Sequence, residues 1–305
     1  MLVCAVDKSE TPKRRLALSA SPFREGREID AGELMSSLLA PNWRQLMTVR
    51  QQLGSFAHLC KEADGIRNKV ALGAYLASTR ILPAQLKQRV SRRNVCVGFR
   101  EFELEFRLSR GELTPYAQIQ TDIARGIIPI PERPDNWVIM DCGANIGLFS
   151  LFLKNAGYII AIEPIDECHE RLSHNFARNG VRGVAVRKAL SDDCGRIRMH
   201  LDALTVLSTV SECGQLEVEA TTIDAVAREY SASHIDLLKL DVEGHELQVL
   251  RGARGMLQER RIHRIYTEYT SPAVLQSLDD SLRPFGFTRV RVSEFNALYE
   301  LLADA

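Results

Sequence analysis

The chain has 305 residues, and 45% of them are hydrophobic, which is enough for a sizeable core in one large or two small domains. Its 39 Lys and Arg residues match 39 Asp and Glu residues, so the formal net charge is +0. This balance disfavours a nucleic-acid partner, and without a signal peptide or a long apolar run we expect no membrane contact. Seven widely spaced cysteines, none in a C-x-x-C pair, disfavour zinc and favour a reducing, cytoplasmic compartment.

The first part of the chain changes composition twice. Residues 1–29 are rich in charge, Ser and Pro, and we expect a flexible tail there. Residues 30–94 have helical periodicity, including an apolar stripe from Leu46 to Cys60 and a helix predicted over Asn68–Ser78. This helical region is too small to stand alone, so it is either a lid or homodimer surface of the following domain or a plain packing appendage.

Residues 95–305 are expected to form the main domain. Apolar residues at even positions alternate with charged residues at odd positions near its start, which predicts a half-exposed strand over Val95–Leu108, one arm of a hairpin on the edge of the domain. A short helix or loop over Asp122–Ile130 follows. The prolines Pro129, Pro131 and Pro134 then mark a boundary before the next strand.

The stretch Val138–Gly147 predicts a strand, a small-residue loop and the start of a helix, which is how a nucleotide-binding α/β unit begins. Glycines suit a sharp turn that a ligand approaches closely, and Asn145 also tolerates a left-handed conformation. The helix that follows offers free N–H groups to an anion. A tight structural turn without a ligand is the alternative.

The next predicted strand ends in Glu163-Pro164. Its acid follows Gly143 by about 20 residues, the spacing at which an acid binds ribose hydroxyls in nucleotide sites. The NAD fingerprint would need glycines at Asn145 and Leu148, and both are absent, which disfavours an NAD-dependent oxidoreductase.

The rest of the chain alternates predicted strands and helices, which indicates a doubly wound α/β fold. The predicted helices are Asp166–Asn179, Leu247–Leu257 and Pro272–Leu282, and the predicted strands are Val184–Val186, Ile197–Leu201, Leu216–Ala220, Ile235–Leu240, Ile262–Tyr266, Phe287–Val292 and Leu298–Leu302.

Four sequence blocks stand in a fixed order: DxGANxG from Asp141, EP at Glu163, DLLKLDVEGHE from Asp236 and VLRGA from Val249. Together they resemble the FkbM family of S-adenosylmethionine methyltransferases over roughly Asp135–Phe287. The resemblance implies a Rossmann-like class I methyltransferase fold behind an N-terminal helical extension. It also implies O-methylation of a small molecule, a sugar or secondary metabolite of natural product biosynthesis. A binding module without catalysis is the alternative.

Predicted strands end in Asp141, Glu163, Asp241 and Glu268, so we expect these acids at the carboxyl edge of the sheet, where ligands of such folds bind. The resemblance and the strand-end positions assign a set of residues to the cofactor. This set is Asp141, Gly143, Ala144, Asn145, Gly147, Glu163, Pro164, Ser191, Asp192 and Asp241. Ser191 and Asp192 follow the predicted strand Val184–Val186, at the place where a residue that contacts the adenine ring often lies in this fold. In methyltransferases the segment before the first strand often lies over the cofactor, so Tyr116, Gln118 and Asp122 are expected to contact it.

The proton chemistry is assigned to the block that follows the strand Ile235–Leu240. A hydroxyl acceptor needs a base, and His245 has a suitable intrinsic pKa, with Asp241 as its orienting group or as the base itself and Glu243 beside them. Asp241, Glu243 and Glu268 are alternatively the carboxylate ligands of a Mg²⁺ ion. A structural ion pair is expected for Lys239, which lies inside the apolar strand.

Overall fold

The structure is a computed structural model that describes residues 60–80, 94–107, 112–132, 136–201, 208–211 and 213–302. These residues fall within one compact unit, Val49–Ala305. The tail predicted over residues 1–29 lies outside the described residues, as does most of the helical region predicted over 30–94. Within that region the structure has α3 (Gly65–Arg80), which contains the helix predicted over Asn68–Ser78. A lid or dimer role for this region stays a prediction.

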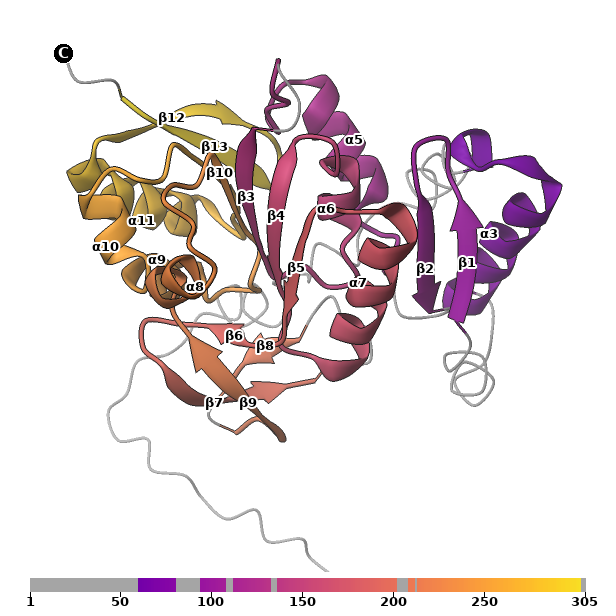
Figure 1. Cartoon of the computed structure of the whole chain (residues 1–305), viewed down its shortest axis with the longest axis horizontal. Coiled ribbons are helices and arrows are strands. Elements are labelled where there is room, and N and C mark those ends of the chain that lie inside the picture. Colours follow the sequence, from indigo (N-terminus) through magenta and orange to yellow (C-terminus); the bar gives the residue numbers. More distant parts are fainter. Residues whose placement is uncertain are drawn as a thin grey trace, which may run out of the picture. The chain divides into compact units, whose positions relative to one another are not determined.

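The main sheet has seven strands in the order β12-β13-β11-β10-β3-β4-β5 (Figure 1). Their bounds are β3 (Trp137–Cys142), β4 (Gly157–Ile162), β5 (Gly183–Val186), β10 (Leu237–Leu240), β11 (Arg264–Glu268), β12 (Phe287–Val292) and β13 (Asn296–Leu301). The strands from β5 to β11 run parallel, and β13 and β12 add antiparallel pairs at one edge. Within this sheet the first strand of the chain is β3. The chain then moves outward through β4 to β5 and returns to β10 on the other side of β3, so the strand order reverses between β3 and β10. This confirms the doubly wound fold.

Each central strand buries both faces, and successive residues belong to different cores. Ile139 and Ile159 contribute to one core, and Met140 and Ile160 contribute to the other. The first core is closed by α5 (Tyr116–Ala124), α6 (Leu148–Phe152) and α7 (Asp166–Asn179). The second is closed by α8 (Ile223–Glu229), α9 (Glu246–Arg251), α10 (Arg254–Gln258) and α11 (Pro272–Leu282). A short 3-10 turn, η3 (Arg283–Phe285), leads from α11 into β12. None of the described helices combines the length and apolar character needed to cross a bilayer.

A second sheet is inserted between β5 and β10, with the order β6-β9-β7-β8. Its strands are β6 (Ala189–Leu190), β7 (Gly195–His200), β8 (Thr209–Val210) and β9 (Leu216–Thr221). The predicted pairing of the strands near 197–201 and 216–220 is confirmed, because β7 and β9 run antiparallel.

Two predicted elements have other bounds in the structure. The hairpin arm predicted over Val95–Leu108 contains both arms of the hairpin, β1 (Asn94–Gly98) paired with β2 (Glu103–Arg107) in a sheet of their own. Phe99 and Phe102 are both buried on either side of the turn, and their separation by three residues breaks the alternation there. The helix predicted over Leu247–Leu257 is divided into α9 and α10. It breaks where Gly252 packs so closely that an added Cβ would lie 2.1 Å from the Ser191 carbonyl oxygen.

A buried ion pair joins α7 to the segment before α5. Nη2 of Arg171 lies 2.5 Å from Oε1 of Glu112, and the two side chains are 2% and 0% exposed. The other carboxylate oxygen of Glu112 accepts a hydrogen bond from the Arg107 backbone at 2.7 Å. Burial raises the pKa of Glu112, against the opposing charge of Arg171 and the hydrogen bond from Arg107.

Replacing Arg171 with leucine should strongly destabilise the fold, because it leaves the Glu112 carboxylate buried without its cation. We expect the free energy of unfolding at pH 7 to fall by about 3–5 kcal/mol, measured by urea denaturation. The double variant Arg171→Leu/Glu112→Leu should recover much of that loss. A double variant as unstable as the single one would show that packing of Arg171, and not charge, is what matters.

Candidate active site

The loop after β3 turns sharply at the centre of the sheet edge. Gly143, Asn145 and Gly147 have φ angles of 77°, 50° and 86°, all in the left-handed region. A Cβ added to Gly143 would lie 1.9 Å from the backbone oxygen of Asp241. Glycine is therefore required at 143 for two reasons, the backbone conformation and the contact with the segment after β10.

Hydrogen bonds to the end of β4 hold this loop in place. The amides of Gly143 and Ala144 both donate to the Ile162 carbonyl at 3.0 Å. The Asn145 amide donates to Oε2 of Glu163 at 2.9 Å. The loop is thus a fixed backbone cradle whose shape depends on the neighbouring strand end.

Glu163 is 5% exposed, and its second oxygen accepts a hydrogen bond from the Ile165 amide at 2.9 Å. Burial raises the pKa of Glu163 to about 7, although the hydrogen bonds from Ile165 and Asn145 and the charge of Lys239 act in the opposite direction. A carboxyl group with a pKa of about 7 changes its acceptor capacity near neutral pH.

The ion pair expected for Lys239 is present, and it lies at the point where the strand order reverses. Lys239 is the register partner of Asp141 across β10 and β3, and its Nζ lies 3.1 Å from the Asp141 carboxylate. The same Nζ donates to the Gly143 carbonyl at 2.8 Å and lies 3.5 Å from the Asp241 carboxylate. Burial disfavours the charge, but Asp141 and Asp241 outweigh it and raise the pKa of Lys239 above its usual range. The second oxygen of Asp141 accepts a hydrogen bond from Ser150 at 2.7 Å.

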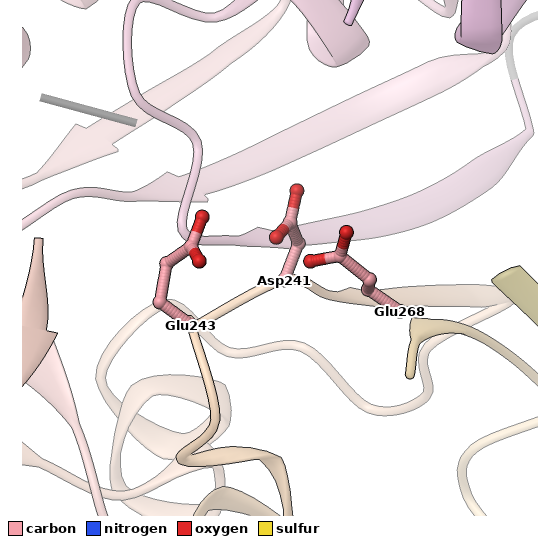
Figure 2. A group of neighbouring side chains, drawn as sticks. All are labelled: Asp241, Glu243 and Glu268. Atoms are coloured by element: carbon pink, nitrogen blue, oxygen red, sulfur yellow. The ribbon is translucent and has the colours of Figure 1, made fainter. Parts of the chain in front are cut away.

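Three carboxylates meet beside this pair. Asp241 follows β10, Glu268 ends the neighbouring strand β11, and Glu243 belongs to the turn after Asp241. Each offers an oxygen that lies within 4.8 Å of the others, and all three side chains are partly exposed. Figure 2 shows Asp241 between the other two, with the three carboxylates pointing to the same side. We call these residues the acidic group.

The turn after β10 directs the side chain of Glu243 toward Asp241 and Glu268. Glu243 and Gly244 have φ angles of 56° and 94°, and the first is unusual for a residue with a side chain. The carboxylate of Glu246, 5% exposed, accepts hydrogen bonds from the amides of Val242 and Gly244 at 3.1 Å. Glu246 therefore stabilises a strained turn, an arrangement that is common at functional sites.

His245 is engaged with a different element. Its Nε2 lies 3.0 Å from Oγ of Ser191, and Ser191 also donates to Asp192 at 3.0 Å. Burial lowers the pKa of His245. The structure thus places His245 with the two residues predicted to contact an adenine ring, and the acidic group is formed without it.

The residues expected over the cofactor are used in packing. Tyr116 is 2% exposed and packs against Phe99 with ring centroids 4.9 Å apart. Asp122 is fully buried and accepts hydrogen bonds from Tyr266, Asn296 and Gln118 at 2.8, 3.0 and 2.9 Å. These contacts account for Tyr116 and Asp122 without a ligand.

A cavity of about 630 Å³ lies beside Tyr116, and Phe102 and Phe152 are among the residues that line it. Asn155 and Ala156 line it as well, and they precede β4. The cavity is therefore at the amino end of the strands, opposite the edge that holds the acidic group.

The loop and the strand ends fit an adenosyl cofactor. Glu163 follows the end of β4, the position predicted to bind the ribose, and Ser191 and Asp192 follow β6. Oδ1 of Asn145 is buried and has no hydrogen-bond partner among the described residues, which leaves an acceptor available in the loop. Ala144 and Pro164 flank the loop and Glu163 as predicted, and the cofactor contacts of the whole set stay predictions.

Sequence reasoning missed two residues that support the loop. Ser150 bonds to Asp141, and Asn175 on α7 donates to the Ile146 carbonyl at 2.8 Å. Asn175 had a detectable signal, since it is a polar residue between Leu172 and Phe176 on the apolar face of its helix.

Comparisons with known proteins identify relatives of this chain. The family profile described as "Methyltransferase FkbM domain" matches residues 141–302, more than half of the chain. Methyltransferase sdnD of Sordaria araneosa is 32% identical over 176 residues, which cover 45% of this chain and 67% of that protein. The hexuronic acid methyltransferase AglP of Haloferax volcanii is 28% identical, with 46% of this chain and 58% of that protein covered. The 31-O-demethyl-FK506 methyltransferase FkbM of Streptomyces tacrolimicus is 29% identical, with 57% and 81% covered. The chain thus spans about two thirds or less of the first two relatives.

Replacing Gly143 with alanine should be more destabilising than the backbone conformation alone explains. Gly180 is a matched control, because its φ is also positive (60°) and an added Cβ there meets nothing within 4 Å. We expect Gly180→Ala to cost about 1 kcal/mol and Gly143→Ala to cost a further 1–3 kcal/mol, because only the second Cβ overlaps a neighbouring backbone. Equal losses in urea denaturation would contradict the close contact between Gly143 and Asp241.

Proposed function

Because this chain belongs to the FkbM family of methyltransferases, we propose that it transfers the methyl group of S-adenosylmethionine to a hydroxyl of a small molecule. The names of its relatives support a sugar or a secondary metabolite as the acceptor, since one acts on a hexuronic acid and another on a demethyl-FK506. The observation that carries the proposal is the meeting of the acidic group with the loop after β3, through the contact of Gly143 with Asp241.

The cofactor would lie on the loop Gly143–Gly147. Glu163 would accept hydrogen bonds from the ribose hydroxyls, and Ser191 and Asp192 would contact the adenine ring. Asp141 is fully buried and already bonded to Ser150 and Lys239, which favours a role in holding the loop over direct contact with the cofactor. When bound, S-adenosylmethionine supplies a methyl group activated by its positively charged sulfur.

The acidic group is proposed to receive the acceptor. Asp241 adjoins the cofactor loop, so a hydroxyl bonded to its carboxylate would lie next to the cofactor. Holding that oxygen in line with the methyl group is the main task of the protein. A carboxylate within hydrogen-bond reach would also take the hydroxyl proton as the methyl carbon changes its bond from the cofactor sulfur to the hydroxyl oxygen, an effect of about 10²–10⁴ in rate. The ammonium of Lys239 lies 3.5 Å from the Asp241 carboxylate and helps to fix its position.

Two other routes for the proton use residues of the same region. His245 is the base predicted from its intrinsic pKa, but its contact with Ser191 favours a role beside the adenine ring. The acidic group also fits a hard cation such as Mg²⁺, because Asp241, Glu243 and Glu268 provide oxygen ligands only. A metal held there would lower the pKa of the acceptor hydroxyl.

Cofactor affinity should depend on pH through Glu163. Below about pH 7 this carboxyl is protonated and is a poorer acceptor for ribose hydroxyls, and above it the carboxylate accepts both. We therefore expect S-adenosylmethionine to bind more tightly as pH rises from 6 to 8. Calorimetric titration across this range measures the effect.

The control for this prediction is Glu163→Gln, which has the same shape and cannot titrate. The ligand's own amino group ionises with a pKa of about 8, but equally in both experiments, so the ratio of the two dissociation constants isolates Glu163. If the ratio of the two dissociation constants stays constant with pH, either Glu163 does not bind the ribose or its pKa is not raised.

Asp241→Asn should reduce turnover by roughly 10²-fold or more while leaving cofactor affinity within about twofold, because the amide keeps the shape and loses the base. His245→Ala should mainly weaken cofactor binding if it lies beside the adenine ring. Both are measured with an acceptor found by screening small hydroxyl compounds. Full turnover in Asp241→Asn would show that the proton leaves by another route.

A chelator separates the direct base from the metal. If the acidic group acts without a metal, turnover is unchanged after treatment with EDTA. Loss of turnover that Mg²⁺ restores, in the wild type but not in Glu268→Gln, would instead favour the metal-assisted route.

A further inference from the structure

Asn175 is a fully buried side chain on α7 that bonds to two different elements. Its Nδ2 donates to the carbonyl of Ile146, in the loop after β3, at 2.8 Å and to the carbonyl of Glu105, in β2, at 3.0 Å. Its Oδ1 accepts a hydrogen bond from the Glu105 amide at 2.7 Å. Both N–H groups of the amide are used, and they point to the loop and to the hairpin.

Asn179, one helical turn later, makes the same contact with β2 but does not reach the loop. It accepts a hydrogen bond from the Glu103 amide at 2.8 Å and donates to the Glu103 carbonyl at 2.7 Å. Its second N–H donates to the Asn175 carbonyl in its own helix at 2.8 Å. The two asparagines therefore share their pairing with β2 and differ in the acceptor of the second N–H, which is in the loop for Asn175 and in the helix for Asn179.

The match between α7 and β2 follows from their repeats. Four residues of an α-helix advance by about 6 Å, and two residues of a strand advance by about 6.6 Å. Asn175 and Asn179 are four apart, and Glu105 and Glu103 are two apart with their backbone groups on the same edge. Each asparagine amide can thus pair with one strand residue as a neighbouring strand would.

Ile146 occupies a sensitive position in the loop. It follows Asn145, whose amide donates a hydrogen bond to Glu163. It precedes Gly147, the N-cap residue of α6, which has a φ of 86°. Ile146 is 1% exposed, so its carbonyl lies where water has little access. The bond from Asn175 fixes the orientation of this peptide, as the bond from Lys239 does for the carbonyl of Gly143.

We propose that Asn175 is a positioning residue for the cofactor loop, and that through it the β1–β2 hairpin stabilises the loop conformation that binds S-adenosylmethionine. The proposal rests on the proposed function only in that S-adenosylmethionine is the ligand of this loop. A loop that holds its binding conformation less often binds more weakly in proportion. Conversely, a ligand that selects this conformation strengthens the contacts that support it, because the coupling is reciprocal.

The test compares Asn175→Ala with Asn179→Ala. Both substitutions remove two hydrogen bonds between an asparagine side chain and β2, but only Asn175→Ala also removes the bond to Ile146. We expect the dissociation constant of S-adenosylmethionine, measured by calorimetry, to rise about tenfold in Asn175→Ala and by less than about twofold in Asn179→Ala, as expected for one buried hydrogen bond. Equal affinities in the two variants overturn the proposal. A wild-type protein that binds no S-adenosylmethionine overturns the proposed function instead.

A second measurement needs no substitution and covers the case in which Asn175→Ala does not fold. The amides of Glu105 and Glu103 donate to Asn175 and Asn179, respectively. Hydrogen exchange in the wild-type protein should show that saturating S-adenosylmethionine slows exchange at Glu105 by at least about threefold more than at Glu103. The same change at both amides, or none at either, overturns the coupling between loop and hairpin.

Discussion

The ion pair between Lys239 and Asp141 is the interaction on which the site depends. Two buried charges face each other across β10 and β3, and desolvation makes such a pair costly unless further bonds satisfy both partners. Here they do so, because Lys239 also bonds to the Gly143 carbonyl and Asp141 accepts a bond from Ser150. The bonds that offset the desolvation of the two charges therefore form only when the loop holds this conformation.

The same pair links the loop after β3 to the acidic group. Gly143 belongs to the cofactor loop and Asp241 to the acidic group, and Lys239 contacts both. Phe149 packs beside it, with the ammonium 5.8 Å from the ring centroid, and in turn stacks on Tyr266. A single residue of β10 thus connects loop, acidic group and aromatic core. Although the whole chain is neutral, this edge of the sheet concentrates acids, which favours a cationic ligand there.

Sequence reasoning located the edge of the sheet but not the directions of the side chains on it. Apolar runs that end in acids predicted that Asp141, Glu163, Asp241 and Glu268 share the carboxyl edge, and the parallel sheet confirms this. Such runs are readable because buried parallel strands need apolar residues on both faces. The prediction of a strand end carries no information on what each acid contacts.

The direction of the His245 side chain could not be predicted from the sequence pattern. Its neighbours Glu243 and Gly244 both adopt positive φ angles, and Glu246 holds that turn through tertiary hydrogen bonds. The turn carries His245 to Ser191, a residue 54 positions away in the chain. The bounds of the hairpin, by contrast, had a signal in the sequence, since the buried Phe99 and Phe102 are three residues apart and shift the phase of the alternation at the turn.

The asparagine pairs of α7 have a consequence for the solubility of the chain. A two-stranded sheet has open edges, and an open edge is a template on which another polypeptide can add a strand. In β2 the outward amides and carbonyls of Glu103 and Glu105 are already occupied by Asn179 and Asn175. The helix takes the place that an intruding strand would need, so this edge is protected against aggregation by side chains that sheet-pairing rules do not consider.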